Sequence, residues 1–247
     1  MVRMKVPEKM RLQRMIALAT SISRRAAEKN IEAGDVEVNG TIVTELGTSV
    51  NPFRDKVKFK GELLILKTER TYFIYNKPRN LMVTKSDPEG RPKIWDKIDP
   101  KYKKLNTVGR LDFETEGILI LSDDGDFINE LTHPKHEIWK TYRAWVRGKL
   151  SKDDIEKLSS GVKIDNYKTL PAKINLKQSE DNNSLVEISI REGKNRQVRK
   201  MFESIGCTVR HLKRLSVGSV KLGRLETGEI RKLRADEVAA LKESCKR

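Results

Sequence analysis

An acidic turn that leads into an apolar strand is the segment of this sequence best suited to chemistry. The run VGRLDFETEGILIL places Arg110, Asp112, Glu114 and Glu116 immediately before GILIL. The end of a strand is a rigid mount for a reactive carboxylate. Acids are also common in ordinary loops, so Asp112 by itself is more typical of a loop residue than of a catalytic one. The rest of the chain must decide between these interpretations.

Two other segments contain residue types that could assist a carboxylate. Lys140-Thr141-Tyr142 begins a strand-like stretch, and residues 191–200, REGKNRQVRK, are strongly basic. Taken alone, Tyr142 is typical of a half-buried strand tyrosine. Arg199 is likewise typical of a surface charge on a helix. Neither residue identifies a function without further context.

Other kinds of site find little support. His133 and His136 lie three residues apart beside Glu137, but no further credible ligand accompanies them, so we expect no metal site. No glycine-rich phosphate loop is present, and we expect no cofactor. A glycoside hydrolase would pair Asp112 with another acid such as Glu114, but the basic charge of the chain argues against it.

The charge balance indicates a polyanionic partner. The chain has 51 Lys and Arg against 35 Asp and Glu, a net charge of +16, and binding a polyanion would release counterions. No apolar run approaches the roughly 18 residues of a membrane-spanning helix, so we expect no membrane. The segment MVRMKVPEKM does not resemble a signal peptide. Cys207 and Cys245 predict no disulfide framework. We therefore expect a cytoplasmic nucleic-acid-binding protein.

Two helices and two hairpins are predicted near the N-terminus. RLQRMIALAT, residues 11–20, has apolar residues at helical spacing. A second helix follows, with Ser23 as its N-cap and Gly34 as its stop. Asn39-Gly40 between alternating strands predicts a tight hairpin, and Lys60-Gly61 suggests another.

The first turn of the second helix contains Arg24 and Arg25, where the helix dipole disfavours cations. Arg11, Arg14 and Lys29 belong to the same pair of helices. These residues predict either a phosphate-binding face or a solvated basic surface.

A second unit begins after LKTER. Strands are predicted at TYFIYNK, GILILS, TYRAWVRG, AKINLKQ and SLVEISI, and helices at DFINELTH, from Ser151 with an S-x-x-D capping box, and at NRQVRKMFESIG. Short strands interrupted by helices indicate an α+β fold. We expect a small N-terminal helix-hairpin domain at residues 8–66. The larger domain, at residues 71–245, is expected to have a mixed, largely antiparallel sheet flanked by helices.

Two families resemble this chain. Residues 11 to about 57, with the Ser-Arg-Arg helix start and the Val-x-Val-Asn-Gly hairpin, are similar to the S-four-type RNA-binding domain. The second unit resembles the RsuA family of ribosomal RNA pseudouridine synthases. That likeness rests on Asn76-Lys77-Pro78, Gly109-Arg110-Leu111-Asp112, Lys140-Thr141-Tyr142, the run Glu192–Arg199 and LSVGSVKLGRLETGEIRKL. It extends over nearly all of residues 11–240.

The resemblance implies that Asp112 is the catalytic carboxylate, with Arg199 as its cationic partner and Tyr142 as the aromatic residue that stacks on the target base. It leaves open whether Asp112 adds covalently or removes a ribose proton. We predict RNA contacts for ten cations: Arg11, Arg14, Arg24, Arg25, Lys29, Lys77, Arg110, Lys194, Arg196 and Lys200. Lys194 stands where the family more often has arginine, which puts a bidentate contact in doubt.

The expected function is site-specific isomerisation of uridine to pseudouridine in ribosomal RNA, with the large subunit favoured over the small. The partner is ribosomal RNA or a ribosome-assembly intermediate, and we expect a monomer. A catalytically unused RNA-binding assembly factor is the alternative from another class. Loss of activity in Asp112→Asn with unchanged RNA affinity would separate the two.

Overall fold

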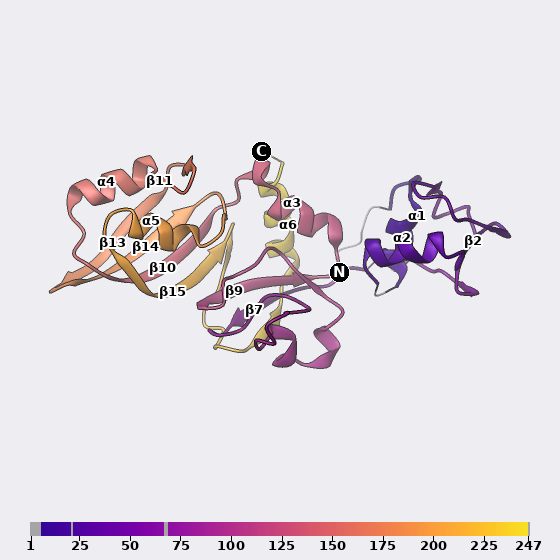
Figure 1. The fold of residues 1–247 in the computed structure, drawn as a ribbon, viewed down its shortest axis with the longest axis horizontal. Helices are drawn as coiled ribbons and strands as arrows, with labels where there is room; N and C mark the ends of the chain where they lie inside the picture. The colour runs from indigo at the N-terminus through magenta and orange to yellow at the C-terminus, as the bar shows by residue number, and fades with distance from the viewer. Residues whose placement is uncertain (1–5, 21, 67–68, 247) are drawn as a thin grey trace. The chain divides into compact units, whose positions relative to one another are not determined.

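The chain folds as two compact units that meet in sequence between residues 70 and 71 (Figure 1). The computed structural model describes residues 6–20, 22–66 and 69–246. Each unit has its own buried apolar cluster.

The N-terminal unit begins with the two predicted helices, α1 (Leu12–Ala19) and α2 (Arg24–Glu32). Leu12, Met15 and Ile16 at helical spacing are buried on one face of α1. The Ser23 hydroxyl accepts a hydrogen bond from the Ala26 amide at 3.1 Å. The predictions of both helices and of the Ser23 cap are confirmed.

Short strands complete the N-terminal unit. They are β1 (Met10–Arg11), β2 (Val36–Val38), β3 (Thr41–Ile42), β4 (Ser49–Val50), β5 (Val57–Phe59) and β6 (Glu62–Leu63). One sheet has the order β3-β2-β5-β6, and β1 pairs with β4. Asn39 and Gly40 have φ of 52° and 89°, and Lys60 and Gly61 have φ of 51° and 82°. Both turns have positive φ at their two central residues, as a tight hairpin requires, so both predicted hairpins are confirmed.

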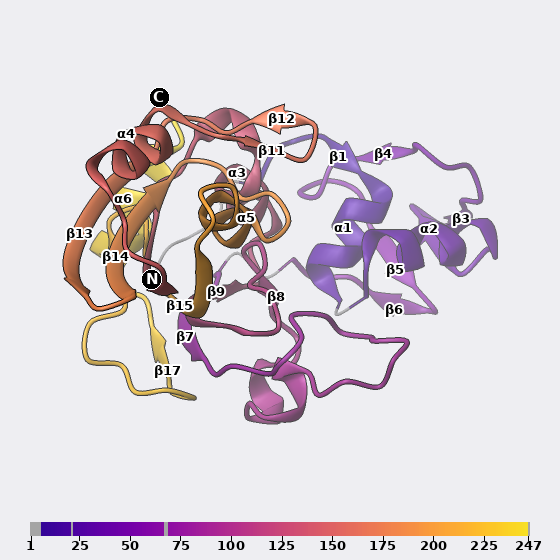
Figure 2. The same cartoon turned by 60° about the vertical axis from the view of Figure 1, so that its left-hand side comes forward.

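The second unit is built on a nine-stranded sheet with the main order β13-β14-β10-β15-β9-β7-β17 (Figure 2). Its strands are β7 (Tyr72–Lys77), β8 (Asn106–Thr107), β9 (Thr115–Ser122), β10 (Lys140–Arg147), β13 (Lys173–Glu180), β14 (Asn183–Ile190), β15 (Thr208–Val217), β16 (Val220–Lys221) and β17 (Ile230–Lys232). A separate hairpin joins β11 (Lys163–Ile164) to β12 (Tyr167–Lys168). Within the described chain, β15 and β9 form the one parallel pair of this sheet. The predicted mixed, largely antiparallel sheet is confirmed.

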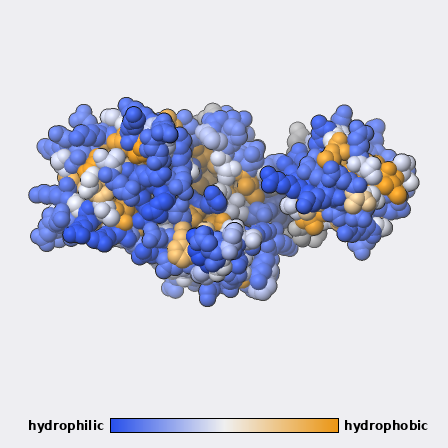
Figure 3. Space-filling model, viewed as in Figure 1, coloured by the Kyte–Doolittle hydropathy of each residue, from blue (hydrophilic) through white to orange (hydrophobic). Residues whose placement is uncertain are grey.

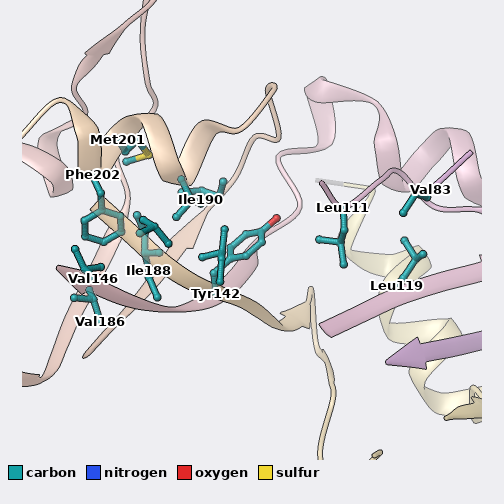
Figure 4. Close-up of a cluster of buried hydrophobic side chains, with 14 of the residues drawn as sticks. Val83, Leu111, Leu119, Tyr142, Val146, Val186, Ile188, Ile190, Met201 and Phe202 are labelled. Carbon is teal, nitrogen blue, oxygen red and sulfur yellow. The ribbon is translucent and has the colours of Figure 1, made fainter. Parts of the chain in front are cut away.

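Helix α5 covers the part of this sheet that contains the main core. The helices of the unit are α3 (Gly125–Thr132), α4 (Lys152–Ser160), α5 (Gln197–Glu203) and α6 (Ala235–Ser244), with 3-10 turns at Ile94–Asp96, Pro100–Tyr102 and Pro134–His136. Figure 4 shows Met201 and Phe202 of α5 above Val146 of β10 and Ile188 of β14. The capping box at Ser151 and Asp154 is present as predicted. Helix α6 was not predicted.

Hydrophilic side chains cover most of the face shown in Figure 3. The largest exposed apolar side chains of the described residues all belong to the N-terminal unit: Ile42, Leu46, Phe53, Leu63 and Ile65. No helix among the described residues is long and apolar enough to cross a membrane.

Candidate active site

One row of paired residues crosses the large sheet and contains Tyr142 and Lys77, two of the polar residues that the sequence singles out. Ile188 of β14 is paired with Tyr142 of β10, and Tyr142 with Arg214 of β15. Arg214 is paired with Gly117 of β9, and Gly117 with Lys77 of β7. Because residues paired across neighbouring strands project to the same face of a sheet, Tyr142, Arg214 and Lys77 share one face.

Lys77 fixes the turn that presents Asp112. Its side chain is fully buried, and Nζ donates to the carbonyl oxygens of Pro78 at 2.8 Å and Thr115 at 2.9 Å. Longer hydrogen bonds reach the carbonyl oxygens of Asp112 at 3.4 Å and Phe113 at 3.3 Å. Four backbone oxygens thus surround one ammonium group. The sequence predicts that Lys77 contacts RNA, whereas in this structure its side chain has no exposed surface.

The Asp112 turn is further closed by its own backbone. The Thr115 amide donates to the Asp112 carbonyl at 3.0 Å, and the Asn80 amide donates to the Phe113 carbonyl at 2.7 Å. Leu111 is buried in the main core, which fixes the chain just before the carboxylate. The Asp112 residue itself is partly exposed. A rigid turn therefore presents a carboxylate that a ligand can reach.

Tyr142 points from the sheet toward this turn. Its side chain joins the core with 7% of its surface exposed, and Figure 4 shows its hydroxyl directed toward Leu111, the residue before Asp112. The strand predicted to contain Tyr142 is present as β10. The geometry brings the aromatic ring and the carboxylate turn to the same part of the core face.

Arg199 is buried in α5 and is paired differently from our expectation. Nη1 donates to the Val209 carbonyl at 3.0 Å, and Nη2 lies 3.8 Å from a carboxylate oxygen of Glu114. No ion pair with Asp112 is present among the described residues. Burial lowers the pKa of Arg199, and the charges of Glu114 and Asp112 oppose that shift. The Asp112 charge thus raises the pKa of Arg199, but Glu114 has the larger effect and is the carboxylate that contacts the guanidinium.

The start of α5 holds the other cations of the basic segment. Arg196 lies 3.7 Å from Glu114, and Lys200 lies 2.5 Å from Asp165 of the β11–β12 hairpin. The Nζ atom of Lys194 is 3.1 Å from the centre of the Tyr167 ring. These three predicted RNA-binding residues therefore have protein partners in this structure. Of the remaining predicted residues in this unit, Arg110 is exposed and forms no ion pair with the described residues.

The cations of the N-terminal unit differ in how far they are engaged by the fold. Arg24, Arg25 and Lys29 are exposed on α2 and form no ion pair with any residue that the structure describes. Arg11 is exposed, but its Nη1 donates to the Gly47 carbonyl. Arg14 is partly buried in α1.

Two further cations near the row were missed or undervalued from the sequence. Lys140 begins β10, and its Nζ donates to the Ile138 carbonyl at 3.0 Å. Burial lowers the pKa of both Lys140 and Lys77 to about 8, and the charge of Arg214 adds to each shift. Arg214 itself is 3% exposed. The sequence signal that could have identified Arg214 was its spacing along β15. Successive residues of a strand face opposite sides, so Arg214 lies on the same face as the apolar Leu212, two residues earlier.

Family models match both units. The model described as RNA pseudouridylate synthase matches residues 71–204, and the model described as S4 domain matches residues 10–55. The first range contains Lys77, Asp112, Tyr142 and Arg199, whereas Arg214 lies outside it.

Similar proteins match almost the whole chain. Ribosomal large subunit pseudouridine synthase B of Bacillus subtilis (strain 168) is 42% identical over 234 residues, which cover 94% of this chain and 95% of the relative. An uncharacterized RNA pseudouridine synthase of Aquifex aeolicus is 36% identical and covers 94% of this chain and 93% of the relative. A crystal structure of a pseudouridylate synthase is similar with a TM-score of 0.67 and 33% identity, over 94% of this chain and 99% of that one.

Proposed function

The chain belongs to the RNA pseudouridylate synthase family, and on that premise we propose that it isomerises one uridine of large-subunit ribosomal RNA. One observation carries the proposal: the turn that presents Asp112 is held by the buried Lys77, at one end of the row that contains Tyr142. The similarity to a synthase of the large ribosomal subunit favours that subunit as the source of the substrate.

We propose that Asp112 performs the essential step of the isomerisation. The reaction breaks the glycosidic bond and rejoins the same base to the ribose through carbon 5, so the product has the same atoms as the substrate. A carboxylate in a partly dry site needs a nearby cation to stay ionised. Arg199 supplies that charge from α5, and Glu114 holds its guanidinium in place until RNA binds.

Tyr142 is proposed to stack on the target base. A uridine within a stem must leave its stack before it reaches Asp112, which costs a few kcal/mol. Stacking on an aromatic ring recovers part of that cost, by about 1–3 kcal/mol per base. The orientation of Tyr142 toward the Asp112 turn supports this role.

The exposed cations are proposed to bind the RNA backbone. Arg24, Arg25 and Lys29 of the S4 domain are available for phosphates because no described acid neutralises them. Arg110 is similarly available beside Asp112, and Arg196, Lys194 and Lys200 would exchange their protein partners for RNA. Backbone contacts of this kind position an RNA without reading its sequence. We place the activity in the cytoplasm, with the chain acting as a monomer on ribosomal RNA or an assembling particle.

The test is a reaction of the purified protein with ribosomal RNA from cells that lack it. Large-subunit and small-subunit RNA are incubated separately, as naked RNA and as assembly intermediates, and pseudouridines are mapped at single-nucleotide resolution. We expect one new pseudouridine, in large-subunit RNA. A new pseudouridine only in small-subunit RNA would contradict the proposed substrate, and none in any sample would contradict the proposed activity.

A further inference from the structure

Arg214 is a buried cation whose hydrogen-bonding capacity is mostly unused. Its Nε donates to the Ile118 carbonyl at 2.9 Å, whereas Nη2 is buried without a hydrogen-bond partner among the described residues. No hydrogen bond or ion pair joins Nη1 to a described residue. Buried polar groups are nearly always hydrogen bonded, so an unpaired one requires an explanation. A partner that arrives with the substrate would complete the hydrogen bonding of this guanidinium.

The position of Arg214 indicates which part of the substrate that partner is. Arg214 lies in the row between Tyr142, proposed to stack on the base, and the Lys77–Gly117 pair beside the Asp112 turn. Gly117 contributes no side chain to the row, because a Cβ there would lie 2.2 Å from the Arg214 carbonyl oxygen. The guanidinium therefore belongs to the same face as the ring and the carboxylate turn.

The charges around Arg214 favour an electron-rich partner. Lys77 and Lys140 are both near enough for the Arg214 charge to lower their pKa. The acids that also act on these two lysines are Asp112, Glu116 and Glu192. The Glu116 carboxylate already contacts His211 and Lys213, each at 3.2 Å, and Glu192 accepts from Gln197 at 2.5 Å. Asp112 is the one of these acids without a side-chain partner in the described structure.

We propose that Arg214 is a catalytic residue that donates hydrogen bonds to a carbonyl oxygen of the target uracil. This inference rests on the proposed function. When the bond from ribose C1′ to uracil N1 breaks, its electron pair stays on the base, and the negative charge spreads onto the ring oxygens. After the base turns, carbon 5 bonds to C1′, the proton on carbon 5 leaves, and N1 gains a proton. A preorganised guanidinium would stabilise the charge that develops in the first step.

A backbone phosphate fits Arg214 less well as a partner. Only 3% of the Arg214 surface is exposed, on the face that also contains Tyr142. A flat base can enter beside an aromatic ring, whereas a phosphate would have to give up its hydration to reach a nearly enclosed group. A phosphate would also be bound equally well before and during the reaction, and would strengthen binding without raising the rate of the chemical step.

The experiment measures RNA affinity and the single-turnover rate for Arg214→Lys and Arg214→Met. The matched control is Arg143→Met in the neighbouring strand β10, where the guanidinium pairs with Glu187 at 2.8 Å and the side chain is 40% exposed. We expect Arg214→Met to lower the rate by about 10²- to 10³-fold, with Kd changed by less than about threefold, and the control to be unaffected. A weaker Kd with a normal rate would overturn the inference in favour of a phosphate contact.

A second measurement separates contact with the base from a structural effect. The target uridine is replaced by 2-thiouridine or 4-thiouridine, since sulfur is a weaker acceptor than oxygen. For one of the two, the natural protein should lose rate and Arg214→Met, which has no donor for the substituted atom, should lose much less, which a merely structural role would not produce. Equal losses in both proteins would overturn the inference. Absence of any pseudouridine with the natural protein would instead mean that the proposed function has failed.

Discussion

The two units of this protein use lysine and arginine in opposite ways. In the S4 unit, Arg24, Arg25 and Lys29 are exposed on one helix without ionic partners among the described residues. In the synthase unit, three cations of the candidate site are removed from water: Lys77 is fully buried, and Arg199 and Arg214 are 4% and 3% exposed.

This difference in burial suggests two separate roles, one in RNA affinity and one in the chemical step. An exposed cation attracts the RNA backbone and is screened by salt. A buried cation is costly to bring into the fold, but its charge is screened less and its position is fixed by hydrogen bonds. We therefore expect changes in the first group to alter RNA binding, and changes around the second to alter rate or stability.

The largest expected effect is that of Asp112→Asn. The single-turnover rate should fall on the order of 10³-fold or more, as is typical when an essential catalytic group is removed, while Kd for RNA changes by less than about twofold. The control is Asp181→Asn, an exposed turn acid between β13 and β14. A parallel loss of rate and affinity would break the separation between the two groups of residues.

Gly117→Ala should destabilise the synthase unit strongly. Gly117 has φ of +108°, and an added Cβ would meet three backbone atoms of Arg214 within 2.9 Å. Strained backbone and overpacking together predict a loss of about 3 kcal/mol or more in the free energy of unfolding, measurable by urea denaturation. Gly193→Ala is the control, since a Cβ at Gly193 would meet nothing within 4 Å. Equal free energies of unfolding for Gly117→Ala and the natural protein would show that the fold does not depend on the close approach of β9 and β15.

Lys77→Met tests the buried ammonium through the pH dependence of stability. The pKa of Lys77 is lowered by burial from 10.5 to about 8. Between these values the unfolded chain keeps a proton that the folded chain has lost, so the contribution of Lys77 to stability rises with pH. The natural protein should gain roughly 2–3 kcal/mol relative to Lys77→Met between pH 7 and pH 10.5, measured by denaturant unfolding. A difference independent of pH would contradict the lowered pKa.

The smallest effect is expected for Arg24→Ala with Arg25→Ala. RNA affinity should weaken, and the slope of log K against log salt should become less steep by about 1 to 2, because two phosphate contacts are lost. The single-turnover rate at saturating RNA should not change. Lys58→Ala provides the comparison, since Lys58 is already paired with Glu37 at 3.0 Å. An unchanged salt slope would mean that α2 does not bind the RNA backbone.

Local signals in the sequence predicted much of the fold. Asn39-Gly40 and Lys60-Gly61 predicted tight turns, and both turns have the positive φ that such turns require. The Ser151 capping box predicted the start of α4. The parallel pairing of β15 with β9 had no such signal, because it joins segments far apart in sequence. Helix α6 was also missed, since its N-cap, Arg234, is not one of the residue types that favour that position.

The candidate site was predicted less completely than the fold. Motif resemblance identified Asp112 and Tyr142 as candidates, but it could not show that Lys77 points inward to the backbone of the Asp112 turn. Alternation along β7 offered a hint, since Tyr75 and Lys77 share the core face. The pairing of Arg199 with Glu114 depends on how α5 packs against the turn, and side-chain pairing of this kind is not encoded by a local pattern.

Pseudouridine mapping of ribosomal RNA in cells is the most direct test of the central claim. Three strains are compared: one with the natural protein, one without it, and one producing Asp112→Asn at the same level. The account predicts that one pseudouridine of large-subunit RNA is present in the first strain and absent in the other two. An identical pattern in all three strains would contradict it and would favour an RNA-binding assembly factor that does not use the chemistry.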